Sequence, residues 1–202
     1  MENYVRIGAI EKARRVRELE QKSRESWLKK ALILLSSILG TIALFSVLFF
    51  YIGTIPLAVQ VWEPLVKEEL KKYDLEEYTP VVLAILAQES GGRNLDVMQS
   101  SESIELPPNT IKSPVRSIKT GVDYFQQSIE RMEQTDVDLD TAIQSYNYGL
   151  GYIDYIKENG GKHTSELAEQ FSKDWAEKMD WSSYGDTQYV YRVNQYRKNI
   201  TE

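Results

Sequence analysis

Cysteine is absent from the 202-residue chain, and histidine occurs once, at His163. Without cysteine there are no disulfide bonds, no thiolate nucleophile and no metal centre with cysteine ligands. A single histidine excludes sites built from several histidines and leaves His163 as the one base available to a Ser-His-Asp triad. The formal net charge of −6 provides no basic surface of the kind that nucleic-acid binding requires. No nucleic-acid partner is therefore expected.

Charge is missing from one long stretch, because residues 31–62 contain no Asp, Glu, Lys or Arg. About 20 apolar residues span a bilayer, so residues 31–55 are predicted to form a transmembrane helix. A cleaved signal peptide is the alternative. Its charged region would be much shorter than residues 1–30, and no clear cleavage site follows the apolar segment.

The two sides of this span differ in charge. Residues 1–30 contain nine Lys and Arg against five Glu, a net of +4, and the whole-chain charge of −6 then leaves −10 for residues 63–202. Basic flanks stay on the cytoplasmic side of a membrane. The prediction is a cytoplasmic basic tail (1–30), a transmembrane helix (31–55), a short linker (56–62) and an extracellular domain (63–202). The lipid bilayer is one expected partner, and function is expected in the outer domain.

The outer domain has the pattern of a helical protein. Thr79-Pro80, with Thr79 as the N-cap, is predicted to start a helix that is apolar all round over 81–87 and therefore buried. Ser113-Pro114 starts the strongest amphipathic helix, whose apolar residues recur three or four positions apart as far as Met132. Shorter helices are expected near 139–147, 150–158, 165–179 and 187–198, and His163 is expected at the surface of a loop. No alternating strand pattern of useful length occurs, so the predicted fold class is all-α.

Glu89 is the most unusual carboxylate, because it ends the predicted buried helix in the segment Gln88-Glu89-Ser90-Gly91-Gly92. The partial negative charge of a helix C-terminus and burial both raise the pKa of a carboxyl group. A carboxylic acid that stays protonated near neutral pH is what glycosidic cleavage requires of its general acid. The alternative from these residues alone is a solvated charge at a helix end.

Several separated segments resemble the goose-type lysozyme and lytic transglycosylase superfamily. They are Gln88-Glu89-Ser90, Met98-Gln99, Tyr146-Asn147-Tyr148-Gly149, and Tyr189-Val190 followed by Val193 and Tyr196. The run from Ala87 to Asn109 is similar to the membrane-anchored Gram-positive branch, the lysozyme-like domains found in pneumococcal vaccine antigen A and in wall hydrolases of conjugative elements. The resemblance covers roughly residues 63–200 and depends on the order and spacing of motifs that are weak individually.

The resemblance implies a lysozyme-like domain that binds peptidoglycan strands and cleaves the β-1,4 bond between N-acetylmuramic acid and N-acetylglucosamine, without a metal or cofactor. Glu89 would be the general acid/base, and Tyr189 would hold it in place. The substrate-binding candidates are Ser90, Met98, Gln99, Tyr146, Asn147 and Tyr189. Simpler interpretations also exist, because Met98 and Tyr189 suit a core and Asn147 suits a turn.

The second carboxylate that hydrolysing lysozymes usually need is less clear. Asp96 and Glu102 are the candidates, and neither matches the goose-type aspartate in position; Asp96 could instead cap the loop. Without such a group the substrate's own hydroxyl could attack and give an anhydro-sugar, as in a lytic transglycosylase. Hydrolysis is preferred here because the more similar branch is regarded as muramidases. A non-catalytic peptidoglycan-binding or scaffolding module is the alternative from another functional class.

Overall fold

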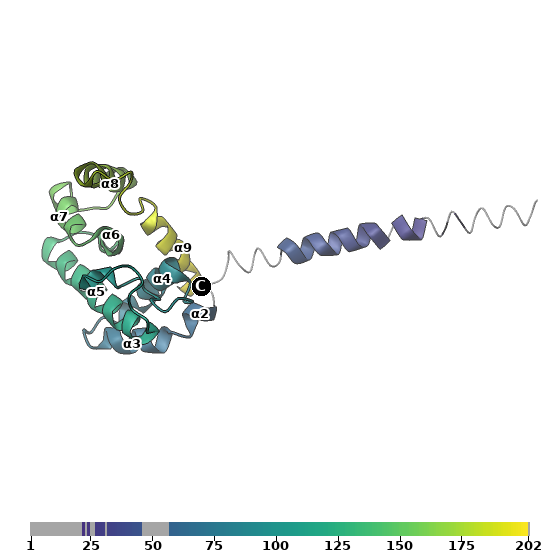
Figure 1. Cartoon of the computed structure of the whole chain (residues 1–202), viewed down its shortest axis with the longest axis horizontal. Helices are drawn as coiled ribbons and strands as arrows, with labels where there is room; N and C mark the ends of the chain where they lie inside the picture. Colours follow the sequence, from purple (N-terminus) through teal and green to yellow (C-terminus); the bar gives the residue numbers. More distant parts are fainter. Residues whose placement is uncertain (1–21, 23, 25–26, 31, 46–56, 202) are drawn as a thin grey trace, which may run out of the picture. The chain divides into compact units, whose positions relative to one another are not determined.

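The structure is a computed structural model that describes residues 22, 24, 27–30, 32–45 and 57–201, in two units divided after Ile52. In the N-terminal unit, the helix Trp27–Phe45 is long and apolar enough, by length and composition, to cross a membrane (Figure 1). The predicted span 31–55 continues into residues that lie outside the described ones, as does most of the basic tail 1–30.

The described residues of the C-terminal unit, 57–201, form helices and no strands, which confirms the all-α prediction. Their order is α2 (Leu57–Gln60), α3 (Glu63–Lys71), η1 (Glu76–Tyr78), α4 (Thr79–Ser90), η2 (Glu102–Ile104), α5 (Pro114–Thr135), α6 (Leu139–Tyr148), α7 (Gly151–Glu158), α8 (Ser165–Met179) and α9 (Tyr189–Thr201). The four shorter helices lie within three residues of their predicted bounds.

The two predicted helix starts have different outcomes. Ser113 caps α5 as expected, because its side chain accepts a hydrogen bond from the N–H of Arg116. The prediction that Thr79 is the N-cap of α4 is wrong, because Thr79 is already helical and its hydroxyl donates to the carbonyl of Glu76 at 2.6 Å. The 3₁₀ turn η1 runs directly into α4, so the chain turns helically before it reaches Pro80.

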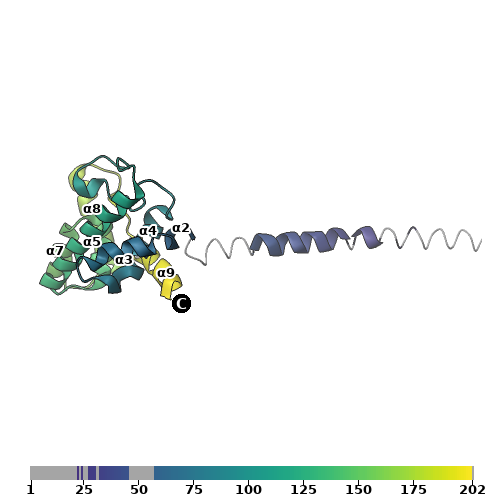
Figure 2. The same ribbon diagram turned by 90° about the horizontal axis from the view of Figure 1, so that it is seen from below.

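Helix α4 lies between α3 and α8, which are at opposite ends of the domain in Figure 1, and Figure 2 shows α3 beside α4. All residues from Val81 to Ala87 are buried, and α9 makes the most extensive helix–helix contact with α4. Around α4 lies the first apolar cluster, and a second one joins α6, α7 and α8 through Tyr148, Tyr152 and Phe171. Helix α6 contributes to both clusters, so its residues 146 and 147 lie where the two clusters meet.

Two local expectations differ from the structure. Residues 57–62, predicted as a linker, belong to the domain, because Val59 is fully buried and the indole N–H of Trp62 donates to the carbonyl of Gly92 at 3.3 Å. The prediction that His163 lies at the surface is also wrong. The ring is partly buried, and its Nδ1 lies 2.9 Å from the hydroxyl of Tyr152.

Candidate active site

The last turn of α4 carries Glu89. The helix ends at Gly91, whose backbone is left-handed (φ 61°) and whose N–H donates to the carbonyl of Ala87 at 2.9 Å. Glycine adopts this conformation without a steric penalty, so the helix stops here. Glu89 is left partly buried at the C-terminal end of the helix, where the helix dipole disfavours a negative charge.

Tyr189 contacts the carboxyl group of Glu89 directly. Its side chain is 2% exposed, and its hydroxyl donates to Oε1 of Glu89 at 2.5 Å. The packing of α9 on α4 brings together these two residues, which lie 100 positions apart in the sequence. Burial and the nearby Glu89 carboxyl raise the pKa of Tyr189 well above its usual value, so the phenol stays a hydrogen-bond donor.

Burial raises the pKa of the Glu89 carboxyl group to about 7. The hydrogen bond from Tyr189 stabilises the charged form and lowers this pKa, whereas the negative charges of Asp96 and Glu102 raise it. The direction of the net shift is the one expected from the sequence. Glu89 therefore carries a proton over most of the mildly acidic range.

Asp96 lies in a buried network of serines. Its carboxylate is 2% exposed and accepts hydrogen bonds from the hydroxyls of Ser101 and Ser117, both at 2.6 Å, and from the N–H groups of Ser100 (3.0 Å) and Ser101 (3.2 Å). Burial by itself would raise the pKa of Asp96, but these hydrogen bonds outweigh it and hold the pKa below its ordinary value. Asp96 is therefore a fixed negative charge, with three donors at Oδ1 and two at Oδ2.

A close contact between α5 and α6 positions Met98 and Tyr146. Met98 is fully buried; its N–H donates to the hydroxyl of Ser117 at 2.9 Å, and its carbonyl accepts from the hydroxyl of Tyr146 at 3.0 Å. A Cβ atom at Gly121 of α5 would lie 2.7 Å from Sδ of Met98 and 2.8 Å from the hydroxyl of Tyr146. Real Cβ atoms do not approach neighbours so closely, so this contact needs glycine at position 121.

The side chains of Ser90 and Gln99 hold the loop after α4. The hydroxyl of Ser90 donates to the carbonyl of Val97 at 2.7 Å. The amide Nε2 of Gln99 donates to the carbonyl of Asp96 and to Oδ1 of Asn109, both at 2.9 Å. Ser90 and Gln99 are also partly exposed, so each can hold the loop and at the same time contact a bound ligand.

Asn147 fixes a second loop, residues 180–188, which joins α8 to α9. Its Oδ1 accepts the N–H of Asp186 at 2.7 Å, and the carbonyl of Asp186 accepts from Nε2 of Gln144 at 3.0 Å. Because this loop continues into Tyr189, the side chain of Asn147 also helps to fix the position of Tyr189, whose hydroxyl donates to Glu89.

Three further residues build this site and were not predicted from the sequence, namely Ser101, Ser117 and Gly121. Ser117 and Gly121 lie four residues apart within the strongest amphipathic helix and are both buried. Small residues inside an otherwise apolar helix face indicate that another segment approaches closely. These small residues indicated a close approach in the sequence, but they did not show that the contacted residues are Asp96, next to Ser117, and Met98, next to Gly121.

The pKa values of Glu89 and Asp96 are shifted in opposite directions, so one carboxyl group is kept protonated and the other ionised. Such pairs separate the roles of proton donor and electrostatic stabiliser. Among the described residues, no group of three or more His, Asp and Glu side chains could hold a metal ion. The site can supply a proton to a leaving group and take one back.

The C-terminal unit is similar to known proteins. Residues 56–202 match the family model described as lysozyme-like. The chain is 51% identical over 118 residues to the bifunctional muramidase/DL-endopeptidase CwlT of Bacillus subtilis, covering 58% of this chain and 35% of that protein. It is 41% identical over 155 residues to the uncharacterized membrane protein YocA of B. subtilis, covering 70% and 69%.

The matched region is also found in streptococcal and staphylococcal proteins. Pneumococcal vaccine antigen A of Streptococcus pneumoniae is 34% identical over 137 residues, 67% of each chain. A crystal structure described as similar to a lipoprotein of the NLP/P60 family, from Staphylococcus aureus, superposes with a TM-score of 0.65 at 43% identity, covering 71% of this chain and 53% of that one. The chain thus spans about a third of CwlT and about half of the staphylococcal chain. Because residues 56–202 match the family model and the relatives have this identity, the chain belongs to the lysozyme-like family.

Proposed function

We propose that the protein is a peptidoglycan hydrolase, and specifically a muramidase that cleaves the β-1,4 bond between N-acetylmuramic acid and N-acetylglucosamine. The observation that carries the proposal is Glu89, a partly buried carboxyl group with a pKa of about 7 that Tyr189 holds at the end of α4. The lysozyme-like family and the similarity to a protein named as a muramidase support it.

In the proposed reaction, protonated Glu89 transfers its proton to the glycosidic oxygen while the bond from that oxygen to the muramyl C1 breaks. The electron pair leaves with the oxygen, and a positively charged oxocarbenium-like sugar remains. The Glu89 carboxylate then removes a proton from the water that adds to C1, and this regenerates the acid. Glu89 loses one proton and regains one in each turnover, so it takes part in both steps.

Asp96 enters this proposal as a stationary negative charge. Its oxygens are fully engaged by serine donors and its side chain is almost completely buried, which suits neither a nucleophile nor a base that activates water. Its charge raises the pKa of Glu89 and favours positive charge on the sugar. Glu102 is exposed at the start of η2 and contributes to the pKa of Glu89 in the same direction.

We also propose that the helix Trp27–Phe45 is part of a single membrane anchor with a cytoplasmic N-terminus and an outward-facing domain. The helix meets the length and composition of a span, the basic residues gather in 1–30, and the relative YocA is named a membrane protein. An anchor of this kind would keep an acidic domain close to an anionic wall that does not attract it electrostatically.

The product of the reaction tests the proposal. Full-length protein in detergent is incubated with purified peptidoglycan, and the released fragments are reduced with borohydride and analysed by mass spectrometry. A muramidase gives fragments that end in reduced muramic acid. Ends of 1,6-anhydro-muramic acid would show a lytic transglycosylase, in which the muramyl hydroxyl takes the place of water. Binding to peptidoglycan without any release would overturn the enzyme proposal and leave a binding module.

The rate of release is expected to depend on the pKa of Glu89. The first step needs the protonated acid, so activity falls as pH rises through about 7. The measurement is the initial rate of peptidoglycan clearing across the mildly acidic to alkaline range at constant ionic strength. A rate that stays constant through neutral pH would contradict the assignment of Glu89 as the acid.

The two other carboxylates are expected to respond differently to neutralisation. Asp96→Asn replaces one acceptor oxygen of the serine network with an NH2 group, which cannot accept a hydrogen bond, and we expect it to cost about 2–4 kcal/mol of unfolding free energy. It also lowers the pKa of Glu89, so the alkaline limb of the pH profile moves to lower pH. Glu102→Gln is the matched control, since it removes an exposed charge and should shift the profile in the same direction with little change in stability.

A further inference from the structure

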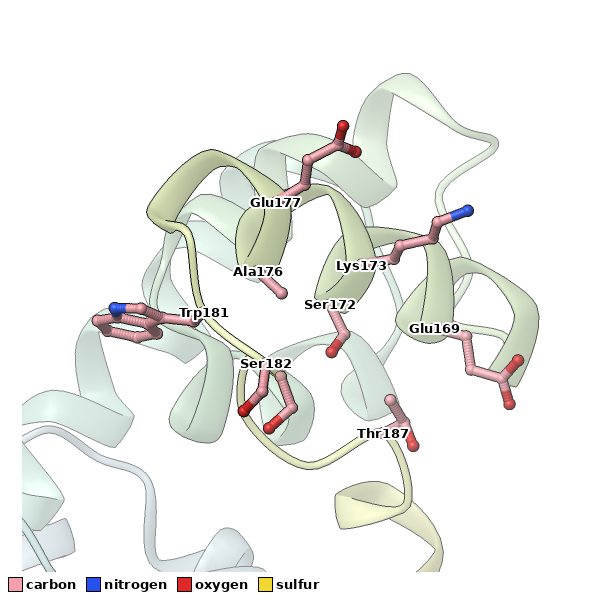
Figure 3. A pocket seen from close by; sticks show the side chains of 9 residues that line it. Glu169, Ser172, Lys173, Ala176, Glu177, Trp181, Ser182 and Thr187 are labelled. Carbon is pink, nitrogen blue, oxygen red and sulfur yellow. The ribbon is translucent and has the colours of Figure 1, made fainter.

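The loop of residues 180–188 contacts α6 closely just before α9 begins. Figure 3 shows this loop running from Trp181 to Thr187 beside a pocket of about 410 Å³, which the loop and α8 line together. The contact with α6 is much closer, because a Cβ atom at Gly185 would lie 2.8 Å from Oδ1 of Asn147. The position of this end of the loop therefore depends on α6.

Asp186 ties the loop to α6 through its backbone. Its N–H donates to Oδ1 of Asn147 at 2.7 Å, and its carbonyl accepts from Nε2 of Gln144 at 3.0 Å. Asn147 and Gln144 lie three positions apart on α6, where side chains of one face are neighbours, and Gln144 is fully buried. Because the two hydrogen bonds engage both backbone groups of one residue, they fix the backbone of Asp186 on α6.

The same residue also holds the first turn of α9. The carbonyl of Asp186 accepts from the N–H of Tyr189 at 3.2 Å, and its Oδ1 accepts from the N–H of Gln188 at 2.9 Å. Its Oδ2 forms an ion pair with the guanidinium group of Arg192. An aspartate that bonds the backbone two residues on makes a turn, and a carboxylate is favourable at a helix N-terminus. Asp186 therefore connects the backbone fixed on α6 to the start of α9.

Tyr189 is the first residue of α9 and depends on this connection. Its hydroxyl donates to Oε1 of Glu89 at 2.5 Å. A hydrogen bond weakens when its length and angle leave a narrow range, so a small displacement of the helix start would weaken this one. The contacts thus lead in series from α6 through Asp186 and Tyr189 to Glu89.

We propose that Asp186 is a positioning residue of the candidate active site, which holds Tyr189 at hydrogen-bonding distance from Glu89 and acts through Tyr189 rather than on the substrate. The inference rests on the proposed function for the reaction that Glu89 performs. Loss of the Asp186 side chain should then have the same consequence for Glu89 as loss of the Tyr189 hydroxyl. The hydrogen bond from Tyr189 stabilises the carboxylate, so either loss should raise the pKa of Glu89.

Direct titration of Glu89 tests the proposal. Full-length protein with isotope-labelled glutamate carboxyl carbons is titrated in detergent by NMR, and the Glu89 signal is identified by its absence from Glu89→Gln. Tyr189→Phe should raise the pKa of Glu89 by about 1, because a hydrogen bond to a charged group is lost. Asp186→Ala should raise this pKa by about 0.5–1, and the double variant should not exceed Tyr189→Phe alone.

Asp186→Asn separates position from charge. The amide keeps an oxygen that can accept from the N–H of Gln188, so the pKa of Glu89 should return close to the wild-type value. If Asp186 acted by its charge alone, both Asp186 variants would lower this pKa. Glu177→Ala, which removes an exposed carboxylate from α8, is the matched control and should leave the pKa unchanged. All these variants retain the other titratable groups that interact with Glu89, which are Tyr146, Asp96 and Glu102.

Gln144→Met covers the case in which Asp186→Ala does not fold. It keeps the length of the side chain, removes the donor to the Asp186 carbonyl and changes no charge, and it should raise the pKa of Glu89 by about 0.3–1. An unchanged or lowered pKa in the folded variants, or effects of Asp186→Ala and Tyr189→Phe that add in the double variant, would overturn the proposal.

The rate of glycan release by the same proteins keeps this proposal separate from the muramidase proposal. If the wild type releases glycan while the pKa of Glu89 does not respond to Asp186→Ala or Gln144→Met, the positioning proposal alone fails. If the pKa responds as expected and the wild type releases nothing, the muramidase proposal alone fails.

Discussion

Glu89→Gln is expected to lower the rate of glycan release by about 10²–10⁴-fold, because it removes the group that donates and accepts the proton in the proposed reaction. The amide keeps the size of the side chain and still offers an oxygen to the hydroxyl of Tyr189. Binding of glycan strands should therefore persist while release stops. The measurement is reduced muropeptide formed per unit time by the full-length protein, and the control is Glu133→Gln, an exposed carboxylate on α5.

The same substitution should make the domain more stable at alkaline pH. The carboxyl group has a pKa of about 7 in the folded protein against 4.5 for an unperturbed Glu, so its favourable contribution is complete below 4.5 and is lost as pH rises through about 7. Above that pH the buried charge costs roughly 3 kcal/mol, which Gln does not incur. Chemical unfolding at pH 5 and pH 8 measures the difference. Equal stability of the two proteins at both values would indicate a solvated Glu89.

Gly121→Ala is expected to reduce both stability and activity. The new methyl group would lie within 3 Å of Met98 and of the hydroxyl of Tyr146, so α5 and α6 must separate. Overpacking of this kind costs about 1–3 kcal/mol, of which the better helix propensity of Ala recovers up to about 1 kcal/mol. The midpoint of thermal unfolding should fall by about 2–8 °C. Displacement of Met98 and Tyr146 by even about 1 Å should lower activity by up to about 10²-fold.

Gly151→Ala is the matched control for this effect. Gly151 is also a glycine within a helix, α7, but a Cβ atom there would have no heavy atom within 4 Å. Its replacement should leave both the melting midpoint and the activity close to the wild-type values. A Gly121→Ala protein that behaves in the same way as the Gly151→Ala protein would show that α5 and α6 have room at this position.

Local sequence patterns predicted a helix boundary correctly where the hydrogen bond that fixes it joins residues close in the sequence. Ser113-Pro114 identified the start of α5 because the capping hydrogen bond joins residues three apart. Thr79 was misassigned because the preceding residues, Glu76–Tyr78, already form a 3₁₀ turn. The burial of Val59 within the predicted linker 56–62 was not foreseen, because it depends on tertiary packing with the core around α4.

The candidate site was predictable in part. The raised pKa of Glu89 followed from a buried helix and its C-terminus, which are both visible in the sequence. The partnership with Tyr189 came from family resemblance, because no local pattern joins residues 100 positions apart. The hydrogen bonds of Asp96 to Ser101 and Ser117 were not foreseen, because hydroxyl donors on a loop and on a distant helix have no periodic signature. The parts of the site that depend on tertiary contacts were therefore not predictable from sequence patterns alone.

The long separation between Glu89 and Tyr189 also has a consequence for the timing of biosynthesis. Glu89 is made long before Tyr189, and at about 5–20 residues per second the intervening 100 residues take roughly 5–20 s. Until α9 docks, the side of α4 that it covers is open to water, so the burial that raises the pKa of Glu89 is incomplete. A nascent chain that still lacks α9 would therefore lack the buried acid that the proposed reaction requires.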